Sequence, residues 1–158
     1  MSFIIVLNSS NNYLSTPDRT VIQYLINFDV LPISKYIMTC SFISSATDNS
    51  PFLDYPSRSM LNIEIGGLPS VNYVAGSRSE AQITQLVGVA HQEAQPTDLG
   101  RSQGILTCSP YDNPPMYLPY RPSSNILTVR TFNADGITPF ERGGFFNYII
   151  RLYFTPID

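Results

Sequence analysis

The stretch Phe145-Phe-Asn-Tyr-Ile-Ile-Arg-Leu-Tyr-Phe154 decides the fold. Its alternate residues are all apolar: Phe146, Tyr148, Ile150, Leu152 and Phe154. The other face carries Asn147, Ile149, Arg151, Tyr153 and Thr155. Period-two patterning with β-branched and aromatic residues predicts a strand that buries one face.

Working outward, similar patterns predict strands along the rest of the chain. The expected ranges are Phe3–Leu7, Thr20–Phe28, Lys35–Ser44, Ser59–Ile65, Val71–Val74, Ala81–Ala90, Gly104–Cys108 and Asn125–Phe132. Phe3–Leu7 is apolar throughout, which predicts a strand covered on both faces. Ala81–Ala90 also fits a helical stripe, but Gly88 and its β-branched residues favour a strand.

About eight strands with turn signals between them, and no segment in which a helix is favoured over a strand, indicate an all-β protein. The strand spacings are uneven and several connections are long. We therefore predict a single jelly-roll (Greek-key) β-sandwich of antiparallel strands, with residues 1–158 forming one domain. An immunoglobulin sandwich is disfavoured because the chain has no tryptophan.

Charged residues make up only 13% of the 158 residues, whereas an average protein has about 25%. Such a neutral surface is typical of proteins that contact other proteins, and also of viral and extracellular β-domains without large interfaces. The net charge is −3, and no basic run exists. Direct nucleic-acid binding is therefore not expected.

The two cysteines, Cys40 and Cys108, lie in two different predicted strands. We expect buried reduced thiols, since nothing indicates a disulfide-dense scaffold. The chain shows no signal peptide and no apolar run long enough for a transmembrane helix. A soluble protein made in a reducing compartment is the expectation.

Catalytic chemistry has little support in the sequence. His91 is the only histidine, lies at a predicted strand end, and is accompanied by no nucleophile motif. One histidine and two distant cysteines do not supply a zinc site. No catalytic residue, metal site or cofactor is therefore predicted. A calcium site remains open, with Asp48 and Asp54, or Asp112 and Asn113, as its oxygen ligands.

The longest connection, Gln92–Ser124, holds the best candidate for a binding surface. Four prolines within Asn113–Pro122 predict that this part forms no regular structure. The candidate interface residues are Tyr111, Met116, Tyr117, Leu118, Tyr120 and Arg121. Tyrosine, methionine and arginine are enriched at protein interfaces. The alternative is a loop that folds back over the end of its own barrel.

Arg130 and Arg151 are two further candidates. Both point away from the apolar faces of the last two predicted strands. If these strands pair, the two arginines lie near each other and could hold an acidic group of a neighbour. The alternative is that they are ordinary surface arginines.

A resemblance to a known family rests on three segments. They are Ile126-Leu-Thr-Val-Arg-Thr-Phe132 with the turn Asn133-Ala-Asp-Gly136, Tyr148-Ile-Ile-Arg-Leu-Tyr-Phe-Thr-Pro-Ile157, and Leu61-Asn-Ile-Glu-Ile-Gly-Gly-Leu-Pro69. These segments resemble strands of single jelly-roll minor capsid and penton-type proteins of large eukaryotic double-stranded DNA viruses and virophages, and the resemblance extends over about half of the chain. The resemblance rests on strand and turn patterns, without any chemical motif.

That resemblance implies a non-enzymatic virion component, made in the host cytoplasm, that assembles with itself or with other capsid proteins. A carbohydrate-binding or receptor-binding β-sandwich, such as a fibre tip or a lectin-like module, is the alternative, with a glycan as its partner. A third class, an enzyme on a jelly-roll scaffold such as a cupin, is disfavoured by the single histidine.

Overall fold

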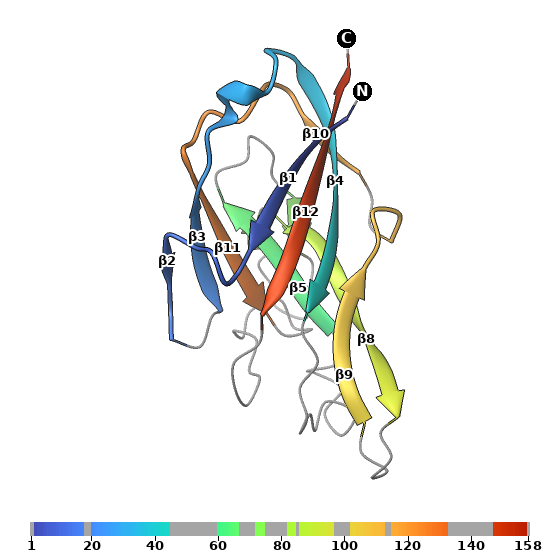
Figure 1. Ribbon diagram of the computed structural model, residues 1–158. Helices are drawn as coiled ribbons and strands as arrows, with labels where there is room; N and C mark the ends of the chain where they lie inside the picture. The colour runs from blue at the N-terminus through green and yellow to red at the C-terminus, as the bar shows by residue number, and fades with distance from the viewer. Residues whose placement is uncertain are drawn as a thin grey trace.

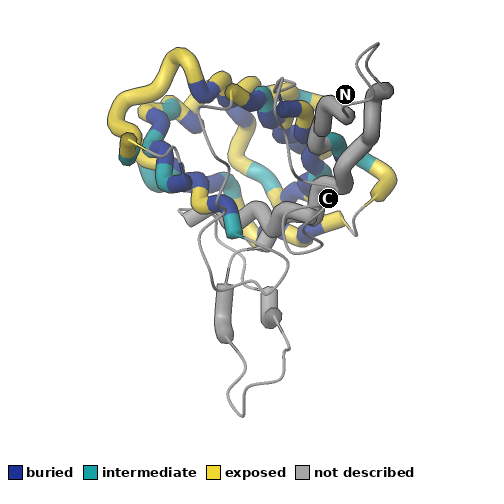
Figure 2. Tube along the Cα trace, turned by 90° about the horizontal axis from the view of Figure 1, so that it is seen from below, coloured by how far each residue is buried: buried dark blue, intermediate teal, exposed yellow. Residues whose placement is uncertain are grey.

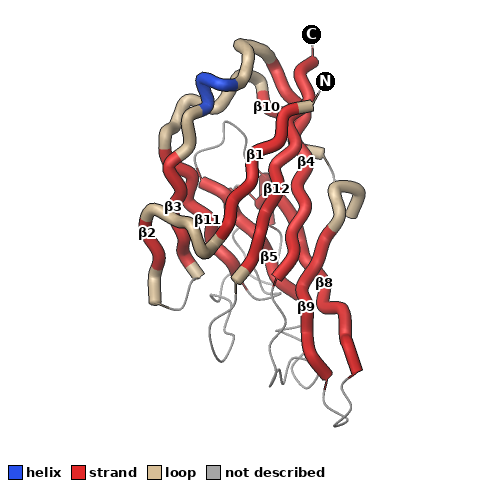
Figure 3. The backbone as a smooth tube through the Cα atoms, in the orientation of Figure 1, coloured by secondary structure: helices blue, strands red, loops and turns tan. Residues whose placement is uncertain are grey.

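In the computed structural model, most of the described residues lie in β-strands (Figure 1). The described residues are 2–17, 20–44, 60–66, 72–74, 82–84, 86–96, 102–112, 115–132 and 147–157, with the backbone alone for the strands between 60 and 106. Within these ranges the one helical element is the 3-10 turn η1, Phe28–Val30 (Figure 3). The prediction of an all-β protein is confirmed.

Twelve strands lie within the described ranges, which is more than the predicted eight because several are very short. Their bounds are β1 Phe3–Asn8, β2 Leu14–Ser15, β3 Val21–Leu25, β4 Lys35–Ser44, β5 Met60–Gly66, β6 Asn72–Val74, β7 Gln82–Thr84, β8 Leu86–Pro96, β9 Ser102–Cys108, β10 Met116–Leu118, β11 Ile126–Phe132 and β12 Tyr148–Ile157. Ala81–Ala90 also fitted a helical pattern, but its described residues lie in the strands β7 and β8.

The strands follow one hydrogen-bonded path in the order β1-β12-β4-β9-β8-β5-β11-β3-β2, with β10 beside β4 and β6 paired with β7. Every pairing between described strands is antiparallel. The path doubles over, so that β1, β12 and β4 form one layer and β5 and β8 lie behind it (Figure 1). Most neighbours in this path are far apart in sequence.

The longest pairing joins β12 to β4 over their whole lengths, from Tyr148 opposite Ser44 to Ile157 opposite Lys35. Along β12 the predicted alternation is confirmed. Its inward residues Tyr148, Ile150, Leu152 and Phe154 are all buried, and its other face is exposed or half-buried. Figure 2 shows buried and exposed positions alternating along other described strands as well.

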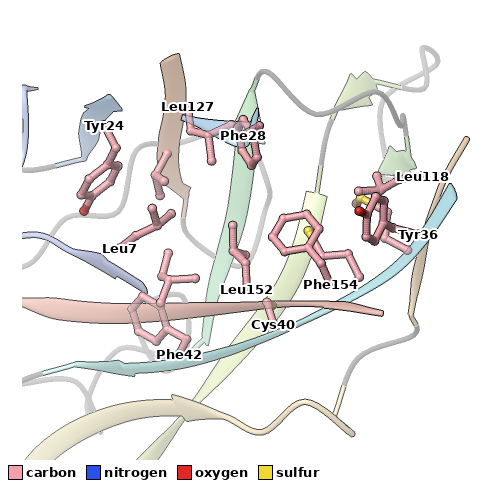
Figure 4. Packing of buried hydrophobic residues seen from close by; sticks show 14 of the residues in the cluster. Leu7, Tyr24, Phe28, Tyr36, Cys40, Phe42, Leu118, Leu127, Leu152 and Phe154 are labelled. Atoms are coloured by element: carbon pink, nitrogen blue, oxygen red, sulfur yellow. The ribbon is translucent and has the colours of Figure 1, made fainter. Parts of the chain in front are cut away.

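The core lies between the layers, where Phe42, Leu152 and Phe154 face Leu127 (Figure 4). Phe154 is central to it. Its ring meets those of Phe28 and Tyr36 edge-on, with centroid distances of 6.1 and 6.0 Å. Edge-to-face aromatic pairs add about 0.5–1.5 kcal/mol each to the stabilisation from burial.

The prediction that Phe3–Leu7 is covered on both faces is wrong. Ile4 and Val6 remain 56% and 54% exposed, while the alternate residues Phe3, Ile5 and Leu7 face the core. β1 belongs to the layer with β12 and β4, which has the core on one side, and the outward residues of this layer are exposed or half-buried.

The long connection Gln92–Ser124 is also shorter than predicted. β8 continues to Pro96 because Gln95 and Pro96 pair with β9, which begins at Ser102. Further on, Met116–Leu118 forms strand β10 against β4, which contradicts the prediction that residues 113–122 form no regular structure.

Cys40 and Cys108 are both buried free thiols, in agreement with the prediction. No helix within the described residues is long and apolar enough to cross a bilayer. The predicted turn at Asn133–Gly136 and the candidate calcium ligands Asp48 and Asp54 lie outside the described residues.

Candidate interaction surface

The layer formed by β1, β12, β4 and β10 presents to solvent a face that combines apolar and polar side chains, here called the outer face. Directly opposite residues in an antiparallel pair share one side of the sheet, so the strand register fixes its members. They are Ile4, Val6 and Asn8 of β1, Ile149, Arg151, Tyr153, Thr155 and Ile157 of β12, Lys35, Ile37, Thr39, Ser41 and Ile43 of β4, and Tyr117 of β10.

The register arranges these residues in rows across the strands. Tyr153 lies between Ile4 and Thr39, and Arg151 lies between Val6 and Ser41. In the next row Ile149 is opposite Ile43, and at the far end Ile37 is opposite Tyr117.

The exposure of these side chains is substantial. Ile37, Ile43 and Tyr117 are 37%, 45% and 51% exposed, in addition to the two β1 residues described above. Single exposed apolar side chains are ordinary, but several on one face of four neighbouring strands make this face a candidate interaction surface.

A groove lined by both polar and apolar residues borders the outer face where β4, β9 and β12 meet the turn after β9. Its volume is about 430 Å³, and Arg151, Tyr153, Ser41, Thr107 and Asp112 are among its lining residues. The hydroxyl oxygens of Ser41 and Tyr153 lie 3.5 Å apart. The Asp112 carboxylate accepts a hydrogen bond from the Ser109 backbone N–H, which holds the turn.

This groove combines one guanidinium, one carboxylate and several hydroxyl groups beside an aromatic ring. Such a set can hydrogen-bond a polar ligand and stack against it. A second hollow of about 350 Å³ lies at the end of the face, lined by Asn8, Ser10, Ile43, Ser44, Asn147, Tyr148 and Ile149.

The predicted interface residues between Tyr111 and Tyr120 divide into an exposed group and a buried group. Tyr111, Tyr117 and Tyr120 are exposed, at 95%, 51% and 57%. Met116 and Leu118 are buried in the core, because β10 turns them inward against β4. Buried side chains cannot meet a partner, so we narrow this part of the candidate interface to the three tyrosines. Through β10, this part of the chain pairs with β4 of the same chain.

Arg121 is held within the chain. Its guanidinium donates to the Leu31 carbonyl oxygen at 2.8 Å and lies 3.0 Å from the Asp29 carboxylate. These two contacts connect Arg121, which follows β10, to η1 and to Leu31 directly after it. We therefore assign Arg121 a structural role ahead of an interface role.

Arg130 and Arg151 are not neighbours, contrary to the expectation for paired strands. β11 pairs with β3 and β5, whereas β12 pairs with β1 and β4. Both side chains are exposed, but Arg130 is opposite Glu64 in register and Arg151 is opposite Ser41. A shared acidic group between the two arginines is therefore excluded by the topology.

The sequence reasoning missed Ile37 and Ile43 as surface residues. The signal was present, since both occupy the face of Lys35–Ser44 that also carries Thr39 and Ser41. His91 lies inside β8, between Met60 and Thr107, and not at a strand end as predicted. Among the described side chains, no three metal-ligating groups come together.

No protein-family model matches the chain, and no curated protein sequence matches it either. The fold and the outer face are therefore the basis on which a function can be assigned.

Proposed function

We propose that this chain is a single jelly-roll structural protein of a virus capsid, in a minor capsid or penton role. In this role it assembles with itself, with other capsid proteins, or with both. It is not an enzyme, needs no cofactor and does not bind nucleic acid directly. It is made in the host cytoplasm and resides in the virion.

The observation that carries the proposal is the pairing scheme of the long strands. Without the short strands β2, β6, β7 and β10, eight strands remain. In chain order the first pairs with the last, the second with the seventh, the third with the sixth and the fourth with the fifth. A jelly roll folds a long antiparallel ribbon over itself in this nested manner, and viral capsid domains are among the proteins that use it.

The surface supports an assembly role. Few residues are charged, and the outer face offers isoleucines with Tyr117, Tyr153 and Arg151. Interface centres are depleted in charge and enriched in aromatic residues and arginine. The mechanism is geometric, because a rigid sandwich holds these side chains in fixed rows for a neighbouring subunit.

Light scattering over a concentration series tests the assembly role. We expect the natural chain to form one defined oligomer, or to bind the major capsid protein of the same virus. A chain with Ile37→Ser and Ile43→Ser should lose that association, because both side chains lie on the outer face. The matched control is Ile33→Ser, since Ile33 is 88% exposed outside the strands. A monomer that binds no capsid protein would contradict the proposal.

The groove beside the outer face favours a second candidate, a carbohydrate-binding or receptor-binding module. Tyr153 would stack on a sugar ring, while Arg151, Asp112 and Ser41 would bind its hydroxyl or acidic groups. A glycan array separates the two candidates. Binding that is lost in Tyr153→Ala and kept in Tyr117→Ala would favour this second function.

A further inference from the structure

The free edge of β1 carries unmatched backbone groups. At the end of this strand the Ser9 N–H donates to the Tyr148 carbonyl oxygen, so residues of odd number on β1 direct their N–H and C=O groups toward β12. The N–H and C=O groups of Ile4 and Val6 must then point away from β12. Within the described part of the chain, no strand lies on that side.

This edge lacks the usual protection against pairing. Natural edge strands carry lysine, proline, a bulge or an inward charge, which prevent another strand from docking. Phe3–Leu7 contains none of these residue types, and its pairing with β12 runs without a register shift. A row of free backbone groups is matched best by another extended strand.

We propose that β1 pairs with β1 of a second copy of this chain, antiparallel, across a twofold axis at Ile5. This inference goes beyond the proposed function and stands without it. The pairing would join the layer β1-β12-β4-β9 to its counterpart and form one continuous sheet.

The position of the axis follows from the free groups. At Asn8 the carbonyl oxygen already accepts from the Asn11 N–H at 2.9 Å, so the usable stretch is Ile4 to Val6. Centring on Ile5 places Ile4 opposite Val6 of the second copy, and all four backbone groups of the stretch find partners. Other antiparallel registers would need the backbone of Ser2, which precedes the strand, or of Asn8 to match all of these groups.

Self-pairing is also supported by the side chains. An isologous contact places each residue against its own counterpart or near it, so any charge in the strand would meet a like charge. Phe3–Leu7 has no charge to repel a second copy. Ile4 and Val6 would cover each other across the new pair and enlarge the outer face.

Sedimentation equilibrium of the full chain tests this contact. We expect the mass of the natural chain to be an even multiple of one subunit. Val6→Pro removes an edge N–H without touching the bonds to β12, since proline is tolerated where the N–H faces solvent. The Val6→Pro variant should therefore have half the mass of the natural oligomer. Ile33→Lys, outside the strands, is the control and should leave the mass unchanged.

If the Val6→Pro variant fails to fold, two oppositely charged variants test the same β1–β1 contact. The chain with Ile4→Lys and Val6→Lys, and the chain with Ile4→Glu and Val6→Glu, should each lose the contact, because like charges then lie opposite. Mixing the two should restore a one-to-one complex. Oxidised Ile5→Cys should form a covalent dimer, whereas Ile33→Cys should not.

Two results would overturn the inference. One is a natural chain that is monomeric at all concentrations or forms only an odd-numbered ring. The other is an oligomer whose mass survives Val6→Pro and both doubly charged variants. The second result would leave the proposed capsid function intact, because the outer face could still form the contacts.

Discussion

Ser9 and Tyr148, 139 positions apart, hold each other by two hydrogen bonds. The Ser9 N–H donates to the Tyr148 carbonyl oxygen at 3.0 Å, and the Tyr148 N–H donates to the Ser9 hydroxyl oxygen at 2.9 Å. Ser9 is fully buried and Tyr148 almost so. The pair fixes where β1 ends against the start of β12, and thereby sets the register of the layer that carries the outer face.

Replacing Ser9 by alanine should lower the free energy of unfolding by about 1–3 kcal/mol, because the buried Tyr148 N–H loses its acceptor. Urea denaturation measures this change. The neighbouring Ser10, an exposed serine, provides a matched control. Ser10→Ala should change stability by about 0.5 kcal/mol or less. Equal losses in the two variants would show that the Ser9 hydroxyl does not hold the register.

Phe154 should be among the most sensitive positions in the core. Phe154→Ala should lower the free energy of unfolding by about 3–5 kcal/mol, since it leaves a cavity and removes two edge-on aromatic contacts. The loss would be a large part of the total stability of a small domain. The adjacent Tyr153, on the outer face, should lose clearly less on replacement by alanine. A similar loss at both sites would contradict the assignment of the two faces.

Tyr36 should make the protein sensitive to alkaline pH. Burial raises the pKa of its hydroxyl, and the positive charge of Arg121 opposes this only in part. The Tyr36 O–H also donates to the Pro32 carbonyl oxygen, which a phenolate cannot do. The unfolded chain ionises near pH 10, so this contribution is present below that pH and is lost as the pH rises further.

The measurement is the free energy of unfolding from pH 8 to pH 11 for the natural chain and for Tyr36→Phe. We expect the natural chain to lose more stability over this range, and the variant to be less stable near neutral pH by about 1 kcal/mol. Parallel curves for the two chains would refute the role of Tyr36.

Both cysteines should react slowly in the folded protein, because both side chains are buried. Cys40 should be the slower of the two, since the hydrogen bond between the sulfurs lowers the pKa of the Cys108 thiol. The hydrogen bond with the Cys108 sulfur and burial raise the pKa of the Cys40 thiol, so it stays protonated at neutral pH. A thiol reagent should therefore label the folded chain slowly, and should label two thiols per chain in denaturant. Rapid labelling of the folded chain, or fewer than two thiols in denaturant, would contradict this expectation.

Strands with strict alternation were predictable from sequence, because one buried face imposes a period of two. β12 and β4 follow this rule, and their inward residues are those that the pattern indicates. The uniformly apolar strand β1 was misjudged. Periodicity reports which residues avoid water on average, but not whether another element of the same chain covers each face.

The remaining wrong predictions arose because they depend on which strands pair with each other. Gln92–Pro96 has weak strand propensity, yet β9 pairs with it and holds it extended. Met116–Leu118 can form a strand despite the flanking prolines. A strand of three residues makes few backbone hydrogen bonds with β4, so the missing proline N–H groups are not needed. The separation of Arg130 from Arg151 depends on which strands become neighbours, and local sequence does not encode this.

The most direct test of the capsid proposal is to ask whether the protein travels with virus particles. Particles purified by density gradient from cells that make this protein can be treated with nuclease, washed in high salt and probed with an antibody. The proposal predicts that the protein bands with intact particles at a fixed ratio to the major capsid protein. A protein that stays in the soluble fractions, while the particles sediment without it, would contradict a structural role in the capsid.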